Sequence, residues 1–174
     1  MLKNIHYSIK FLLLFCVFYF GTYIMIGLAA PGGFCFSFIE HYLDYVTWLR
    51  MSLLYGSKFF LSLFGYFSHL EADFTLRLNG GRHVIIAYDC AGYGVLSFWM
   101  AYILSAPAKN NYQRFFWLIF GLCLLWLINC MRISLFLLSR NGIARIPFKM
   151  DHHLFYNIIS YLFIGLLIFL HEYF

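Results

Sequence analysis

Residues 115–138 read FFWLIFGLCLLWLINCMRISLFLL and contain one charged side chain, that of Arg132. A run of this length and polarity can cross the hydrocarbon core of a bilayer, which takes about 20 residues of helix. The rest of the chain has a similar character, because 63% of its 174 residues are hydrophobic and only 11% are charged. A soluble domain carries roughly 25% charged residues. The sequence therefore predicts an integral membrane protein.

Other apolar segments predict further membrane spans at 11–30, 90–106 and 153–170. The first resembles a signal peptide, but it is long for one and Pro31 follows its only small-residue site, so we expect a retained span. Residues 34–67 leave two alternatives, a poor span or an amphipathic helix in the headgroup layer, and their charges favour the second. Those charges are Glu40, Asp44, Arg50 and Lys58.

Residues 71–88 change character and predict a β-hairpin. Residues 74–78 alternate apolar and polar side chains, residues 79–81 read Asn-Gly-Gly, and residues 84–86 are β-branched. An open two-stranded edge cannot lie in hydrocarbon, so the hairpin belongs on one face of the membrane. We therefore expect an all-α polytopic membrane bundle of about four to six helices, with a small β-hairpin before the helix that carries Cys90.

The cysteine pattern and the charge exclude several classes of protein. Five cysteines without a CxxC pair argue against a disulfide framework, a zinc site and a thiol-redox carrier, so no metal and no cofactor is expected. The formal charge of +5 comes from scattered basic residues, which favours anionic membrane lipids over nucleic acid as partners. We expect residues 1–174 to form one integral membrane domain, with an N-terminal part at 1–67 and a core at 68–174.

Polar residues from three segments converge on one membrane face if consecutive spans are antiparallel. Cys90 begins one helix, Arg132 comes near the end of the next, and His153 opens the last. A charged residue as deep in a span as Arg132 is costly and usually functional. Asn129 precedes it by three positions and shares its helical face. Cys130 is turned about 200° away from Arg132, which favours Cys90 as the reactive cysteine.

These residue types suit acyl transfer through a thioester. A thiolate attacks a peptide carbonyl, a histidine takes the thiol proton, and a guanidinium stabilises the oxyanion. A position at a helix N-terminus favours the thiolate. Structural explanations stay open, because Arg132 could be a snorkelling cation and the histidines could anchor the last span. Cys90 could likewise pack in a stripe of small side chains, which comprises Gly94, Ser97 and Ala101.

The chain resembles the exosortase and archaeosortase family over residues 66–174. Cys90-Ala91-Gly92 matches the family's C-[SA]-G motif at a helix start. Asn129 and Arg132 match its N-x-x-R motif in an apolar helix. A strand-like segment before the cysteine motif is also similar to the family. The chain is shorter than typical members, which carry more N-terminal spans.

The same resemblance assigns the histidine. In small members the histidine that opens a late helix is often followed four residues later by asparagine, and His153 with Asn157 has that spacing. His152 does not have it and remains the alternative. The resemblance thus implies Cys90, Arg132 and His153 as the catalytic set. Supporting residues would be Asp89, Gly92, Asn129, His152 and Asn157.

The function implied by the resemblance is that of a membrane-embedded cysteine peptidase or transpeptidase. It would lie in a bacterial or archaeal cytoplasmic membrane, with the β-hairpin and the active site on the extracytoplasmic face. Its substrates would be secreted proteins that end in a short motif, a hydrophobic helix and a basic tail. The acceptor of the acyl group stays open between water, an amine and a lipid hydroxyl. The alternative is a non-enzymatic membrane assembly or accessory subunit, in which Cys90 tolerates replacement by Ser or Ala.

Overall fold

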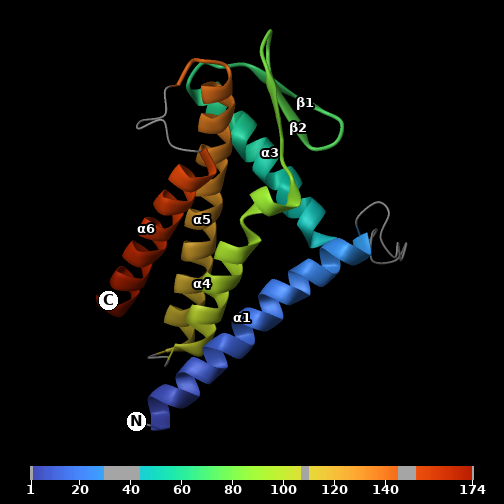
Figure 1. The fold of residues 1–174 in the computed structure, drawn as a ribbon. Helices are drawn as coiled ribbons and strands as arrows, with labels where there is room; N and C mark the ends of the chain where they lie inside the picture. Colours follow the sequence, from blue (N-terminus) through green and yellow to red (C-terminus); the bar gives the residue numbers. More distant parts are fainter. Residues whose placement is uncertain (1, 30–43, 107–109, 145–151, 174) are drawn as a thin grey trace. The chain divides into compact units, whose positions relative to one another are not determined.

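The computed structural model describes residues 2–29, 44–106, 110–144 and 152–173. Within these ranges the chain forms five α-helices, one short 3-10 helix and a three-stranded antiparallel sheet (Figure 1). The chain divides into two compact units. One is drawn from residues 1–47 and 92–125, and the other from 48–91 and 126–174.

In the first unit, helix α1 (Leu2–Ala29) packs against helix α4 (Tyr93–Ser105) through aromatic rings. Tyr19 lies 5.4 Å from the ring of Tyr93, and Phe11 meets Phe98 edge to face at 5.3 Å. Tyr19 also lies over Gly94, where an added Cβ would come within 3.5 Å of its ring. This distance is an ordinary van der Waals contact, so the approach of the two helices at this position does not depend on glycine.

Helix α5 (Asn111–Arg140) has its N-terminal part in the same unit. The indole of Trp99 on α4 is fully buried, and its Nε1 donates to the Trp117 carbonyl at 3.3 Å. Gly121 leaves the space that this indole fills, because an added Cβ would overlap the ring. A glycine thus sets the closest approach of α4 to α5.

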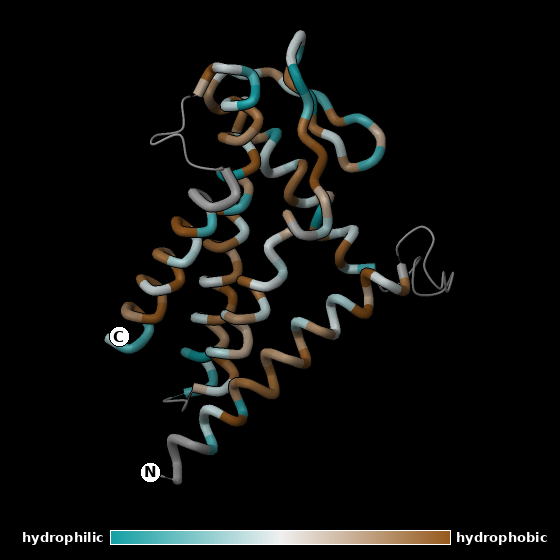
Figure 2. Tube along the Cα trace, in the orientation of Figure 1, coloured by the Kyte–Doolittle hydropathy of each residue, from teal (hydrophilic) through white to brown (hydrophobic). Residues whose placement is uncertain are grey.

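Among the described residues, two helices are long and apolar enough to cross a membrane. His6–Leu28 in α1 and Asn111–Arg140 have mean hydropathies of 2.2 and 2.0. Figure 2 shows apolar residues along most of α1, and its large side chains Leu13 and Val17 are more than half exposed. The helices agree with the apolar segments predicted at 11–30 and 115–138. Together they indicate a membrane protein.

Helix α4 is shorter than the span predicted at 90–106, and that prediction is wrong at its start. The helix has 13 residues and so measures about 20 Å, against roughly 30 Å of hydrocarbon core. Gly92, with φ 73° and ψ 20°, is in the left-handed region and separates the helix from Cys90. Ala106 ends it in an extended conformation, as expected for a residue before Pro107.

The last helix, α6 (His152–Tyr173), belongs to the second unit and begins one residue before the span predicted at 153–170. The part whose side chains are described, Asn157–Tyr173, is an apolar helix that is shorter than the two candidate spans. Ile164 and Leu167 are buried three positions apart, which defines one inward face of the helix.

The second unit contains the sheet. Strands β2 (Thr75–Leu78) and β3 (His83–Ile85) pair antiparallel, with Arg77 opposite His83, so the predicted hairpin is confirmed. A further strand, β1 (Ser68–Glu71), pairs with β2 and makes the sheet three-stranded, so the expectation of only two strands is wrong. The turn before β2 has Asp73 and Phe74 at positive φ, 57° and 56°. Because neither Gly nor Pro marks this turn, the sequence pattern did not reveal it.

Polar side chains join the first two strands. Arg77 Nε donates to Glu71 Oε1 at 2.5 Å, and His69 Nε2 lies 3.3 Å from the same oxygen. The Arg77 hydrogen bond lowers the pKa of the Glu71 carboxyl below its usual range. Because these groups are exposed, the contact adds little stability. Its main effect is to place charged side chains on the outer strand, which discourages pairing with a strand of another chain.

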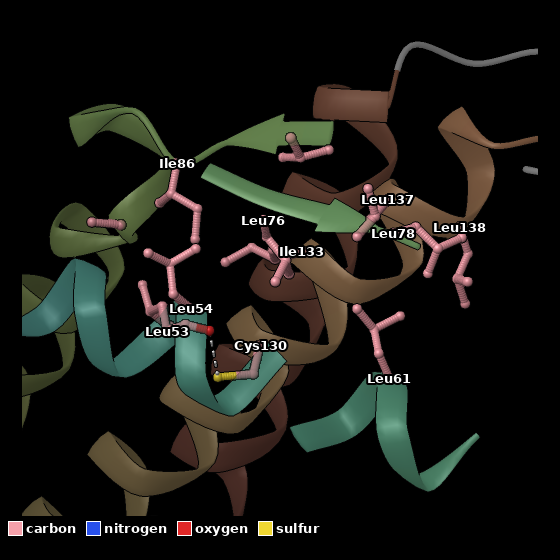
Figure 3. Close-up of a cluster of buried hydrophobic side chains, with 12 residues drawn as sticks. Leu53, Leu54, Leu61, Leu76, Leu78, Ile86, Cys130, Ile133, Leu137 and Leu138 are labelled. Carbon is pink, nitrogen blue, oxygen red and sulfur yellow. Dashed lines mark hydrogen bonds between the residues drawn. The ribbon is translucent and has the colours of Figure 1, made fainter. Parts of the chain in front are cut away.

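The core of the second unit lies between helix α3 (Tyr45–Leu63), the sheet and the C-terminal half of α5 (Figure 3). Its fully buried side chains include Leu53, Leu61, Leu76 and Leu137. Helix α3 buries one face in this core, while large apolar side chains such as Trp48, Tyr55 and Phe59 are exposed on the rest of the helix. The choice for residues 34–67 between a poor span and an amphipathic helix in the headgroup layer stays a prediction. Residues 34–43 lie outside the described part of the chain.

Small and hydroxylated residues bring α3 and α5 together. Ser57 Oγ donates to the Cys130 carbonyl at 3.2 Å, and Ser134 Oγ donates back to the Ser57 carbonyl at 3.1 Å. Trp126 Nε1 donates to Ser52 Oγ at 3.0 Å. Such hydrogen bonds between apolar helices hold them in register.

Gly56→Ala should destabilise this contact. An added Cβ would lie 2.5 Å from Cys130 Sγ and 2.8 Å from the Trp126 ring, so the helices would have to separate. Overpacking of this kind costs about 1–3 kcal/mol and should lower the Tm of the purified protein in detergent. Gly165→Ala is the matched control, because its added Cβ meets nothing within 4 Å. Equal Tm values for the two variants would contradict close packing at Gly56.

Candidate functional site

Cys90 lies in the 3-10 helix η1 (Tyr88–Ala91), which follows β3 directly. Its backbone N–H donates to the Ala87 carbonyl at 3.0 Å, and its side chain is half-buried. The expected position at the start of the following helix is wrong, because Gly92 intervenes in a left-handed conformation. This conformation favours glycine, which gives a physical reason for the glycine of the Cys90-Ala91-Gly92 motif.

Asn129 on α5 holds the turn that carries Cys90. Its Nδ2 donates to the Ala91 carbonyl at 3.0 Å and to the Cys90 carbonyl at 3.3 Å. The amide nitrogen thus donates to two consecutive carbonyls of the turn. The structure therefore brings Asn129 and the backbone of the Cys90 turn together.

Arg132 follows Asn129 by three residues on α5. It is half-buried, and the helical repeat places it on the same face, about 4.5 Å farther along the axis. The helix face that meets the Cys90 turn through Asn129 therefore presents a guanidinium within the next turn.

The other cysteines of the described ranges differ from Cys90. Cys130 is fully buried in the core, and its Sγ lies 3.9 Å from the Leu53 carbonyl (Figure 3). Cys16 is half-buried in α1 and Cys123 is exposed on α5. This agrees with a packing role for Cys130, and leaves Cys90 as the cysteine beside a polar side chain of α5.

The predicted histidines stand at the start of α6. His152 is its first residue and His153 its second, but their side chains and that of Asp89 lie outside the described part of the chain. Asn157, one turn later, is exposed. The choice between His152 and His153 therefore stays a prediction.

The Oδ1 atom of Asn129 is shielded from solvent and has no hydrogen-bond donor among the described residues. A buried acceptor left in this way costs about 1–3 kcal/mol. A donor such as a peptide N–H would relieve that cost. Within the same ranges, no three His, Cys, Asp or Glu side chains are grouped to hold a metal ion.

Sequence reasoning missed Arg50. It was taken as a charge that interrupts an apolar segment, yet its side chain is only 6% exposed and its guanidinium donates to the Ile86 carbonyl. The signal was present, since a lone arginine in an apolar helix is expected to have a specific partner.

A family model described as transmembrane exosortase matches residues 4–170, nearly the whole chain. No curated protein and no solved structure matches.

Asn129→Asp should loosen the Cys90 turn. At pH 8 the new carboxylate would face two carbonyl oxygens that need a donor, so we expect a loss of about 1–3 kcal/mol and a lower Tm in detergent. Gln113→Glu makes the same chemical change at an exposed position of the same helix and should leave the Tm unchanged. If the two variants melt alike, the Asn129 hydrogen bonds do not hold this turn.

Proposed function

The chain belongs to the transmembrane exosortase family, and from this premise we propose that it is a membrane-embedded cysteine peptidase or transpeptidase that cleaves the C-terminal sorting signal of secreted proteins. The observation that carries the proposal is the pair of Asn129 hydrogen bonds to the Cys90 turn. Those bonds place the backbone of Cys90 against the face of α5 on which Arg132 follows one turn later.

In the first step, the Cys90 thiolate attacks the carbonyl carbon of the scissile peptide bond. His153 has taken the thiol proton, and the Arg132 guanidinium stabilises the negative charge on the carbonyl oxygen. The tetrahedral intermediate collapses, the C–N bond breaks, and the leaving amine takes the proton from His153. The products are a thioester on Cys90 and the released hydrophobic tail.

In the second step, an acceptor attacks the thioester carbonyl. The acceptor gives its proton to His153, the C–S bond breaks, and Cys90 leaves as thiolate. Water as acceptor makes the enzyme a peptidase. An amine or a lipid hydroxyl makes it a transpeptidase that attaches the secreted protein to the acceptor.

Two observations support the role of Arg132 and Asn129 in this scheme. An arginine within an apolar helix is expensive and usually serves a function, and Arg132 is half-buried in the C-terminal half of α5. The unpartnered Oδ1 of Asn129 would accept an N–H from the substrate backbone and so orient the scissile bond.

The site would lie on the extracytoplasmic face of a bacterial or archaeal cytoplasmic membrane, in a polytopic bundle. The sheet supports a place at a membrane surface, because its exposed polar edge requires water or headgroups. The large exposed apolar side chains of α1 would face lipid or the hydrophobic helix of the substrate's sorting signal.

Cys90→Ala should abolish processing of a co-expressed substrate that ends in a motif, a hydrophobic helix and a basic tail. The measurement is loss of the tail, seen as a mobility shift. Cys123→Ala is the matched control, because this cysteine is exposed on α5 and has no part in the scheme. Processing that survives Cys90→Ala would reject the mechanism and favour the accessory-subunit alternative.

His153→Ala should slow processing by about 10²–10⁴-fold, the usual contribution of a general acid–base group. His152→Ala should process at a rate close to that of the wild type. Time courses of tail loss, with both variants at equal abundance in the membrane, decide between them. A large loss in His152→Ala alone would transfer the role to His152.

A further inference from the structure

Arg50 of α3 binds the segment that leads into the Cys90 turn. Its Nε and Nη2 donate to the carbonyl oxygen of Ile86 at 3.0 and 2.6 Å. Hydrogen bonds from a charged donor are stronger than those between neutral groups. The Ile86 side chain is buried and points toward Leu54 (Figure 3), so both the side chain and the carbonyl of this residue are held.

The same guanidinium contacts two aromatic rings. Its central carbon lies 3.6 Å from the centroid of the Phe74 ring and 4.2 Å from that of Tyr88. The Ile86 N–H also donates to the Phe74 carbonyl at 3.0 Å. Arg50 thus joins the turn before β2 to the start of η1, in a place where the backbone is already paired.

These contacts lie on either side of Ala87, the residue whose backbone binds that of Cys90. Ile86 and Tyr88 lie on either side of Ala87, whose carbonyl accepts the Cys90 N–H. Arg50 therefore fixes the entrance of the turn, while Asn129 fixes its exit through the Cys90 and Ala91 carbonyls.

The chemistry of arginine suits this task. A planar guanidinium donates from two nitrogens and stacks on rings at once, whereas a lysine ammonium is a compact point charge. A buried charge adds little net stability, since apolar residues of similar volume often replace it without loss. The cost of burying Arg50 is therefore better explained by the geometry it imposes than by stability.

We propose that Arg50 is a positioning residue for the acyl transfer, one that sets the backbone of 86–90 and with it the place of the Cys90 thiol. This inference rests on the proposed function. At 6% exposure Arg50 is not open to the substrate, so it acts through the turn.

The test uses the full chain in lipid nanodiscs and two readouts. Hydrogen exchange of a peptide spanning 84–92 reports on the turn without substrate, and a peptide spanning 68–78 reports on the sheet. Processing of a motif–helix–basic-tail substrate gives kcat and KM. The variants are Arg50→Lys and Tyr88→Leu, and Lys58→Gln is the control, a cation on the exposed side of the same helix.

We expect Arg50→Lys to exchange faster at 84–92 but not at 68–78. Its kcat should fall by about 10- to 100-fold while KM stays within about twofold, because a small misplacement of a reacting group has effects of this size. Lys58→Gln should match the wild type in both readouts. If Arg50→Lys does not accumulate, Tyr88→Leu removes one ring of the same contact and is judged by the same criteria.

Unchanged exchange at 84–92, or an unchanged kcat, would overturn the positioning role. A rise in KM alone would also overturn it, because it would indicate substrate binding. Failure of the proposed function is seen separately, as processing that continues in Cys90→Ala. In that case the exchange data still decide whether Arg50 holds the turn.

Discussion

An amide inside an apolar helix must find hydrogen-bond acceptors, and Asn129 on α5 finds them in the Cys90 turn. An unpaired polar group in such surroundings costs roughly 1–3 kcal/mol, so the helix and the turn are bound to one another by a local requirement of α5. The consequence for chemistry follows from the helical repeat. The face of α5 that satisfies this requirement carries Arg132 one turn later, in the same unit as Cys90.

The scaffold behind the turn gives this pairing its rigidity. Leu53 and Leu54 of α3 and Leu76 of β2 pack into one core with the C-terminal half of α5 (Figure 3). The register of β2 with β3 then fixes the position at which the chain enters η1. Arg50 holds the entrance of the turn and Asn129 its exit, so two helices far apart in sequence constrain four residues around the cysteine.

The sequence predicts those features of the fold that follow from hydrophobic periodicity and composition. The apolar runs predicted as spans correspond to α1 over residues 11–29 and to α5 over residues 115–138, and the Asn-Gly-Gly turn joins β2 to β3. Strand β1 was not predicted because the turn that follows it has positive φ at residues other than glycine. The role of Arg50 was not predicted because its partners, one carbonyl and two rings, lie far along the chain. The late start of α4, at Tyr93 after Gly92, depends on a backbone conformation that a pattern of apolar residues does not reveal.

The central claim is that Cys90 carries the secreted protein as a thioester. The direct measurement is acid quenching of the wild-type protein during turnover of a tailed substrate, followed by mass spectrometry of the cysteine-containing peptides. The account predicts that the N-terminal part of the substrate is attached to Cys90 and is released by hydroxylamine. Cleaved substrate with Cys90 unmodified throughout, or acylation of another cysteine, would contradict it.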